Sequence, residues 1–289
     1  MTLEQLRIFV AVAERLHMTR AAEALHLSQS AASSAIAALE TTHGVKLFER
    51  VGRGLELSDA GREFLPEARA VLARAKAAAQ ALDDVAGLSR GSISLGASQT
   101  VSSYWLPPRM ARFAERHPGV ALSMIAGNTA QIVEAVVDGR ADLGFVEGDV
   151  SEPALRSEVV ASDRIGLYVA PGHALAGREV GIEALRSAAW VLREPGSGTR
   201  SHFEHQMAAR GAALEDLRVV LELPSNDAVL AAAMNAELVT AVSGLAAEPL
   251  IATGRLKQLP FALAARSFSL ISHRERRRSR AAEAFVTEL

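Results

Sequence analysis

The spacing of apolar positions changes twice along the chain, from short helical repeats to one long repeat and then to alternating strands and helices. Over the first 43 residues, apolar side chains recur every three or four positions, as in amphipathic helices. Thr2 and Gln5 have the spacing of a capping box, and the hydroxyl of Ser28 suits the start of a helix. The pattern therefore predicts three short helices, the third running from Ser28 to His43.

The predicted third helix exposes small polar residues instead of charge. Its apolar residues would face inward, whereas the outer face near its N-terminus carries Gln29, Ser30, Ser33 and Ser34. Glutamine can hydrogen-bond adenine in the major groove, and serine can donate or accept at several base edges. The two helices and the tight turn between them predict a helix-turn-helix that reads DNA with Ser28 and these four residues.

A β-hairpin is expected directly after these helices. Val45–Phe48 and Leu55–Leu57 have strand character and flank the flexible turn Gly52–Gly54. Arg50 and Arg53 would lie on this wing and contact phosphates on either side of the groove. A helical bundle with an incidental hairpin is the alternative, but a wing with two arginines that follows at once favours DNA binding. Residues 1–58 are therefore predicted to form a winged helix-turn-helix domain.

A single long helix is predicted between Ser58 and Gly91. Apolar residues recur there at spacings of three and four for about three heptads, with charged and polar residues on the other faces. A helix of roughly 27 residues would be about 40 Å long. We interpret residues 59–90 as a linker and dimerisation helix that sets the distance between two DNA-reading domains, closed by a hinge at Gly87, Ser89 and Gly91. Packing of the helix against its own domain is the alternative.

From Ser92 onward, strands and helices alternate, which predicts a parallel sheet with right-handed crossovers. A first set has strands at Ser92–Gly96, Val120–Ile125 and Leu143–Val146 and helices at Val101–Arg116 and Thr129–Asp138. A second set has strands at Ile165–Val169, Trp190–Leu192, Val219–Leu223 and Val239–Val242 and helices at Thr199–Arg210 and Ala228–Met234. Ser267–Ser272 is expected to return to the first sheet before a last helix at about Ser279–Glu288. The fold class is α/β, with an effector-binding domain at 91–289 (lobe I at 91–162 and 267–289, lobe II at 163–266).

Three strand ends in this α/β domain carry the same chemistry. Each has hydroxyl groups and free backbone N–H groups at a helix N-terminus, where the helix dipole favours negative charge. The segments supply Ser98, Gln99, Thr100, Asn128, Thr129, Ser197, Gly198 and Thr199. We expect a small anion between them in the cleft, although helix capping alone would also explain each segment. Glu147 belongs to the same site, so its carboxylate must be protonated, paired with a cation or turned away.

Composition restricts the function classes. The 289 residues have a formal charge of −2, so attraction to DNA must come from local basic patches and from two copies acting together. The absence of cysteine excludes disulfides, thiolate metal sites and a thiol-based oxidant sensor. The sequence has no apolar signal core, no bilayer-length apolar run and no close-spaced histidine pattern for a metal. We expect a cytoplasmic protein without cofactor, metal or membrane contact.

Two further features have simple interpretations. We interpret His202 and His205, on one predicted helix, as surface residues. The run from His273 to Arg280 has five arginines, but it connects a strand to the terminal amphipathic helix, and we expect a solvated corner there and not a DNA contact. Acid and base side chains occur without a nucleophile–base arrangement, so enzyme function has no support.

The amino-terminal region contains four characteristic motifs, which are Ser28-Gln29-Ser30-Ala31-Ala32-Ser33, Leu39-Glu40, Gly44-Val45-Lys46-Leu47-Phe48-Glu49-Arg50 and Leu57-Ser58-Asp59-Ala60-Gly61. These motifs resemble those of LysR-type transcriptional regulators. The resemblance covers the whole chain and implies two lobes similar to periplasmic solute-binding proteins and dimers that pair into tetramers. Family members often have proline where Ser30 stands and basic residues where Ser34 and Ala37 stand. Phosphate anchoring would therefore fall to Arg20, Lys46, Arg50 and Arg53.

The effector domain resembles the branch of this family that controls sulfur assimilation and senses sulfite or a related oxyanion. The resemblance lies in Gly96–Thr100, Gly127–Thr129, Gly144–Gly148 and Arg193–Arg200, whereas Ala236–Leu238 replaces a common Gly-x-Gly turn. The expected partners are double-stranded promoter or operator DNA, a small anionic effector such as sulfite, and further copies in a homodimer or homotetramer, with RNA polymerase as another candidate. A solute-binding protein of a transport system and an α/β-cleft enzyme are the alternative functions.

Overall fold

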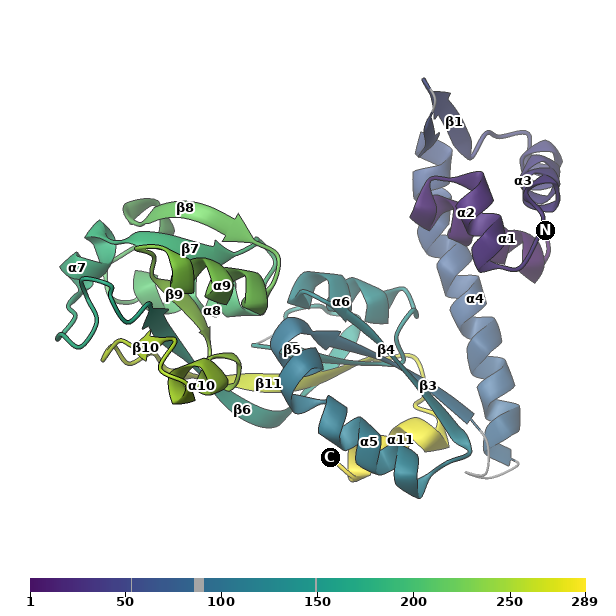
Figure 1. Ribbon diagram of the computed structural model, residues 1–289. Helices are drawn as coiled ribbons and strands as arrows, with labels where there is room; N and C mark the ends of the chain where they lie inside the picture. The colour runs from purple at the N-terminus through teal and green to yellow at the C-terminus, as the bar shows by residue number, and fades with distance from the viewer. Residues whose placement is uncertain (53, 86–90, 149) are drawn as a thin grey trace. The chain divides into compact units, whose positions relative to one another are not determined.

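The computed structural model describes residues 1–52, 54–85, 91–148 and 150–289 and separates into two compact units, Met1–Val85 and Ala86–Leu289 (Figure 1). The predicted hinge residues Gly87 and Ser89 and the wing residue Arg53 lie outside the described residues. Among the residues that are described, no helix is both long and apolar enough to cross a membrane.

Three short helices build the amino-terminal head, as the apolar spacing predicts. They are α1 (Leu3–Arg15), α2 (Met18–Ala24) and α3 (Gln29–His43). The predicted caps are confirmed: the Thr2–Gln5 capping box has both of its hydrogen bonds, and the hydroxyl of Ser28 accepts the N–H of Ala31 at 3.2 Å. The inward faces of the helices share one core around Phe9, which is fully buried.

The predicted wing is an antiparallel hairpin of β1 (Phe48–Val51) and β2 (Gly54–Leu57). Glu40, near the end of α3, holds the start of this wing. Its buried carboxylate accepts hydrogen bonds from the N–H of Leu47 at 2.9 Å and from Nζ of Lys46 at 2.6 Å. Burial raises the pKa of Glu40, but the Lys46 ammonium and the backbone N–H groups outweigh it and hold the pKa below its ordinary value. An ionised Glu40 therefore connects α3 to the wing.

The long helix α4 (Asp59–Val85) has the 27 residues that the repeat predicts. Its first half packs on the head, where Ala68 is fully buried and Leu65 and Leu72 join the core. Its second half extends beyond the head (Figure 1), and Leu82 is 75% exposed there. The alternative interpretation, packing on its own domain, holds for the first half of the helix, and dimerisation through the second half stays a prediction.

Lobe I is built on three parallel strands, β3 (Gly91–Ser98), β4 (Val120–Gly127) and β5 (Leu143–Glu147), with β3 in the middle. Its helices are α5 (Pro107–Arg116), α6 (Thr129–Val137) and α11 (Arg280–Thr287), and a π-helical turn, η1 (Val101–Trp105), precedes α5. The ring of Phe285 on α11 has its centroid 5.1 Å from that of Phe113 and 6.1 Å from that of Phe145. The terminal helix therefore completes the core of this lobe.

Lobe II pairs β7 (Ala189–Arg193) in parallel with β8 (Arg218–Leu223), and β9 (Thr240–Ser243) antiparallel with β6 (Leu155–Val169). Its other elements are α7 (Ile182–Ser187), α8 (Gly198–Ala208), the 3₁₀ turn η2 (Leu214–Asp216), α9 (Asn226–Asn235), α10 (Gly244–Ala252) and β10 (Lys257–Gln258). The sequence pattern misses α7 because it is short, and α10 because it is nearly all apolar and contains Pro249.

Two long strands, β6 and β11 (Ala265–His273), pass from one lobe to the other and pair antiparallel. The seven-stranded sheet therefore runs through both lobes, in the order β10-β6-β11-β5-β3-β4 with β9 beside β6. The sequence predicts only parts of these strands, because polar and charged side chains interrupt their apolar pattern at the crossing. Arg266 lies directly opposite Asp163 at this crossing.

Part of the arginine-rich corner after β11 forms hydrogen bonds within the protein. Arg276 donates hydrogen bonds to the carbonyl oxygens of Val136 at 2.7 Å and Val137 at 2.6 Å, at the end of α6. A cation at a helix C-terminus also complements the helix dipole. Arg274 and Arg277 are exposed, as a solvated corner requires. The corner therefore faces solvent and at the same time anchors α6.

The first turn of α4 packs against the chain before the wing and leaves no space for a side chain at Gly61. A Cβ atom there would lie 2.1 Å from the carbonyl oxygen of Leu47. We expect Gly61→Ala to lower the free energy of unfolding of the first unit by about 1–3 kcal/mol, measured by urea unfolding followed by far-ultraviolet circular dichroism. Both tryptophans, Trp105 and Trp190, lie in the second unit, so the transition seen by tryptophan fluorescence should not move.

The matched control is Gly54→Ala. Its Cβ would lie 3.4 Å from its nearest neighbour, the carbonyl oxygen of Val51. This contact is close, but it requires little movement of the neighbouring atoms. Equal losses in the two variants would contradict the assignment of the effect to close packing at Gly61.

Candidate functional site

The first turns of α3 present the side chains predicted to read DNA. Gln29, Ser30 and Ser34 are exposed, and Ser33 is half-buried. Ser28 is exposed as well, but its hydroxyl caps the helix and lies 3.0 Å from the hydroxyl of Ser30. Gln29 and Ser34 therefore have the most accessible hydrogen-bonding groups of this set, and Ser28 has a structural task besides any contact with DNA.

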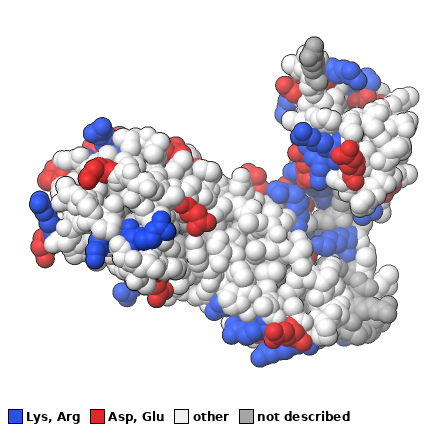
Figure 2. All heavy atoms as spheres, in the orientation of Figure 1, with Lys and Arg blue, Asp and Glu red and all other residues white. Residues whose placement is uncertain are grey.

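Cations near α3 are few and local. Arg20 on α2 and Arg50 on β1 are exposed. The unit Met1–Val85 carries 10 Lys and Arg against 11 Asp and Glu, and Figure 2 shows both signs interspersed on the face that it draws. Attraction to phosphates at this unit must therefore come from single side chains such as Arg20 and Arg50, because no excess of positive charge supports it.

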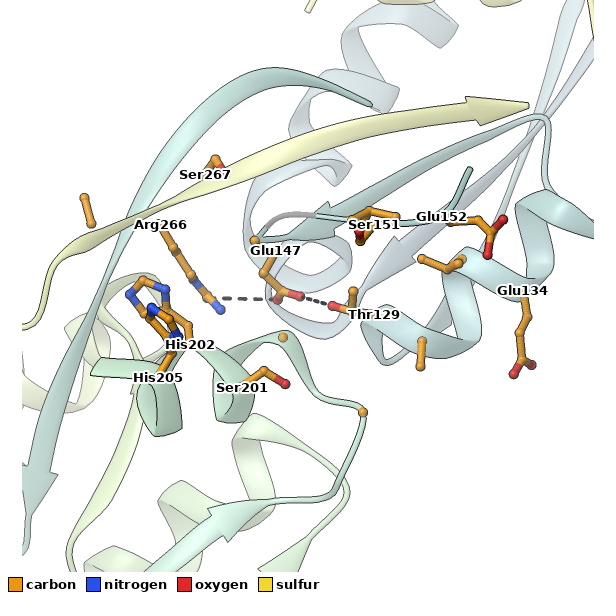
Figure 3. Close-up of a pocket in the computed structure, with 17 residues that line it drawn as sticks. Thr129, Glu134, Glu147, Ser151, Glu152, Ser201, His202, His205, Arg266 and Ser267 are labelled. Atoms are coloured by element: carbon orange, nitrogen blue, oxygen red, sulfur yellow. Dashed lines mark hydrogen bonds and ion pairs between the residues drawn. The ribbon is translucent and has the colours of Figure 1, made fainter. Parts of the chain in front are cut away.

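A cleft of about 740 Å³ lies between the lobes of the second unit (Figure 3). Its walls are α6 and the chain after β5 in lobe I, the first turns of α8 in lobe II, and the start of β11. Of the predicted effector residues, Thr129, Glu147 and Gly198 line this cleft. The other lining residues with polar side chains are Glu134, Ser151, Glu152, Ser201, His202, His205, Arg266 and Ser267.

Two of the predicted effector residues are helix caps. Asn128 forms a capping box with Gln131 at the start of α6. The hydroxyl of Ser197 accepts the N–H of Arg200 at the start of α8, at 3.5 Å. Asn128 also donates through its amide to Glu194 of lobe II at 3.3 Å. Helix capping, the alternative for these segments, accounts for both residues, and neither of them lines the cleft.

The carboxylate of Glu147 lies where the sequence predicts the anion. It accepts hydrogen bonds from the N–H of Thr100 at 3.1 Å and the hydroxyl of Thr129 at 3.3 Å, and Arg266 lies 4.0 Å away. Burial raises the pKa of Glu147, but the Arg266 guanidinium outweighs it, together with the hydroxyls of Ser98 and Thr100 and the Thr100 N–H. The pKa is therefore held below its ordinary value. Glu147 is thus a buried anion, 3% exposed, that is paired with a cation.

Arg266 joins this cluster to both lobes, and the sequence pattern does not indicate it. Its guanidinium donates to Thr199 of lobe II at 2.9 Å and to Thr100 of lobe I at 3.3 Å. It also donates twice to Asp163, at 2.6 and 2.9 Å, and its side chain is fully buried. The pairing of Arg266 with Asp163 follows from the register of β6 and β11, and a single sequence does not give this register. The remaining predicted residues Ser98, Thr100 and Thr199 are buried in or beside this network, and Gln99 is half-buried.

The lobes approach each other closely at Gly198. A Cβ atom there would lie 2.5 Å from Oγ1 of Thr129 and 2.7 Å from the carbonyl oxygen of Glu147. Nearby, the N–H of Ala130 donates to the carbonyl oxygen of Gly196 across the two lobes at 3.3 Å. Gly198 therefore permits the contact between the lobes, besides lining the cleft.

His202 and His205 line the cleft from α8, where His205 is exposed, as expected of a surface residue, and His202 is half-buried. Ring atom Nε2 of His202 lies 2.9 Å from the carbonyl oxygen of Ala264. Burial lowers the pKa of His202, and the charges of Arg266 and His205 act in the same direction, against the Ala264 carbonyl. In the part of the chain that the structure describes, no group of three or more histidine or acidic side chains is placed to hold a metal ion.

A winged helix-turn-helix on one unit and a two-lobed α/β cleft on the other define a DNA-binding transcriptional regulator with a domain for a small ligand. Residues 3–62 match the bacterial regulatory helix-turn-helix proteins of the lysR family, and residues 86–289 match the LysR substrate binding domain. The chain belongs to the LysR family of transcriptional regulators.

Individual relatives agree with this assignment. The chain is 32% identical over 287 residues to the uncharacterized HTH-type transcriptional regulator YeiE of Escherichia coli K12, covering 99% of this chain and 96% of that protein. It is 31% identical over 231 residues to the HTH-type transcriptional regulator CysL of Bacillus subtilis, covering 80% and 76%. The fold resembles the crystal structure of full-length CbnR complexed with its target DNA, with a TM-score of 0.69 and 24% identity over 100% of this chain and 98% of that one.

These matches confirm the expected family and the expected fold class. The matched families and relatives are transcriptional regulators, which supports a regulator in place of an enzyme or a transport protein.

Removing Arg266 would leave Asp163 and Glu147 buried without their cation. Their side chains are 4% and 3% exposed, so we expect Arg266→Gln to lower the free energy of unfolding of the second unit by about 3–5 kcal/mol. Urea unfolding followed by tryptophan fluorescence measures this, and adding Asp163→Asn should recover part of the loss. Arg255→Gln, at an exposed position of the same lobe as Asp163, is the control. A loss at Arg266 as small as that of the control would contradict the role of the pair.

Proposed function

We propose that this LysR-family regulator responds to a small anionic effector in the cleft between its lobes, with sulfite or a related oxyanion as the first candidate. The observation that carries the proposal is the wall formed by α8 and the start of β11. Ser201, His205 and Ser267 line the cleft there with groups that can donate hydrogen bonds (Figure 3). The sulfite candidate rests on the resemblance of Gly96–Thr100 and the segments after it to the sulfur-assimilation branch.

The proposed anion binds against α8 and not in the cradle around Thr100. Glu147 already holds a negative charge in that cradle, and a second anion would be repelled by it. The predicted effector residues then have two roles. Thr129, Glu147 and Gly198 line the site. The residues that support the site without lining it are Ser98, Gln99, Thr100, Asn128, Ser197 and Thr199.

A bound effector would act on DNA by changing how the effector domains of two copies pair. Such a change alters the spacing or bend imposed on two operator half-sites. The proposed assembly is a homodimer or homotetramer, supported by the exposed Leu82 and the alanine-rich second half of α4. The proposed divisions are 1–58 for DNA binding, 59–90 for the linker helix and 91–289 for the effector. RNA polymerase is a candidate partner.

Calorimetric titration of the full chain with sulfite, sulfate, phosphate and acetate tests the anion site. We expect at least one of them to bind with a Kd below about 1 mM. The double variant Ser201→Ala and His205→Ala should weaken that binding about tenfold by removing two donors from the α8 wall. His43→Ala, at an exposed position of the other unit, should leave it unchanged. Absence of binding by all four anions would rule out sulfite and the other simple anions as the effector.

Variants of the first unit separate phosphate contacts from base contacts. We expect Arg50→Gln, and likewise Arg53→Gln, to weaken binding to all DNA sequences and to reduce the slope of log Kd against log salt by about one. Gln29→Ala should instead change sequence preference by about 1–3 kcal/mol and keep the salt slope. Arg178→Gln, exposed on lobe II, is the control for a lost charge. An unchanged footprint and affinity in Gln29→Ala would remove this residue from base recognition.

A further inference from the structure

The polar residues that line the cleft fall into two groups by their chemistry. Ser201 and His205 on α8 form a donor side, since hydroxyl and imidazole groups can donate hydrogen bonds, whereas Nε2 of His202 already lies 2.9 Å from the carbonyl oxygen of Ala264. Glu134 on α6 and Glu152 after β5 form an acidic side. Figure 3 shows the histidines on the left and these two glutamates on the right, with Glu147 and Thr129 between them. The cleft is therefore polarised from one side to the other.

The acidic side is not neutralised by the cleft's own cation. Arg266 is the one Lys or Arg among the described residues that line the cleft. Its guanidinium is fully buried, is bound to Asp163 by two hydrogen bonds, and lies 4.0 Å from Glu147. The buried carboxylates of Asp163 and Glu147 therefore already balance the positive charge of Arg266. Among the described residues that line the cleft, no further Lys or Arg remains to balance the carboxylates of Glu134 and Glu152.

Both carboxylates of the acidic side can accept further hydrogen bonds. Glu134 is exposed, and within the described residues its carboxylate has no hydrogen bond or ion pair. Glu152 is half-buried and uses Oε1 to accept the N–H of Ala154 at 3.1 Å, which leaves Oε2 for a ligand. A charged donor such as an ammonium group makes stronger hydrogen bonds to carboxylates than a neutral donor.

The size of the cleft also exceeds what an inorganic oxyanion fills. Its volume of about 740 Å³ lies within the range of roughly 300–1,000 Å³ that is usual for sites of organic ligands. An isolated anion on the donor side would leave the acidic side empty and would be repelled by its charges. A ligand with a positive group at its other end would replace this repulsion by attraction.

We propose that the effector is a dipolar organic ion, with a carboxylate or sulfonate on the donor side and an ammonium group bound by Glu134 and Glu152. This inference rests on the proposed function, because the anionic group takes the site proposed above. It narrows the ligand class to amino acids and aminosulfonates, and it makes Glu134 and Glu152 the residues that determine specificity for the amine.

Matched pairs of ligands that differ only in the amine test this inference on the full chain by calorimetry. The pairs are taurine with ethanesulfonate, β-alanine with propionate, 4-aminobutyrate with butyrate, and 6-aminohexanoate with hexanoate, so that the distance between the charges also varies. In at least one pair we expect the aminated compound to bind about tenfold tighter. The double variant Glu134→Gln and Glu152→Gln should abolish that difference and bind the amine-free partner as well as before, or better.

Glu115→Gln is the matched control, because Glu115 is exposed on α5 and does not line the cleft. It should keep the full preference for the amine. Equal binding within every pair, or an undiminished preference in the double variant, would overturn this inference and leave the proposed anion site standing. If neither these compounds nor sulfite bind, both the inference and the proposed function are refuted.

Discussion

The pairing of Arg266 with Asp163 is the interaction on which the ligand-binding unit depends. Burying two charges is costly, and good geometry with additional hydrogen bonds must offset that cost. Here the two residues face each other across the strands that connect the lobes, and Ser243 donates to the free side of Asp163 at 2.9 Å. The guanidinium reaches Thr100 in one lobe and Thr199 in the other. Asp163, Ser243 and Thr199 belong to the same lobe as Arg266, whereas the hydrogen bond to Thr100 joins the buried pair to the other lobe.

Further polar contacts join the lobes, beside the packing of Tyr104 on an apolar cluster of lobe II. Asn226 of lobe II donates to Thr100 at 3.2 Å, and the hydroxyl of Tyr104 donates to Asp227 at 3.3 Å. Hydrogen bonds of this kind contribute only about 1 kcal/mol each, because water replaces them when they break. An interface built from them can open at moderate cost, whereas an apolar interface of the same size would stay shut.

The features that follow from local rules could be predicted from the sequence, and those that depend on strand register could not. The caps at Thr2 and Ser28 involve neighbours within three residues, and α3, the wing and the 27-residue α4 follow from apolar spacing. The helix N-termini in the sequence also indicate the position of the cradle at Thr100 and Thr129. Its occupant, Glu147, and the cation beside it depend on how distant strands align, as do the cleft positions of His202 and His205.

Helix α6 spans lobe I from the cleft to the arginine-rich corner. Thr129 and Glu134 on its amino-terminal part line the cleft, while Arg276 grips the carbonyl oxygens of Val136 and Val137 at its other end. Its nine residues form a stiff rod about 14 Å long. The wall of the cleft and the corner that precedes the terminal helix are therefore two ends of one short helix, which is packed on the sheet through Ile132, Ala135 and Val136.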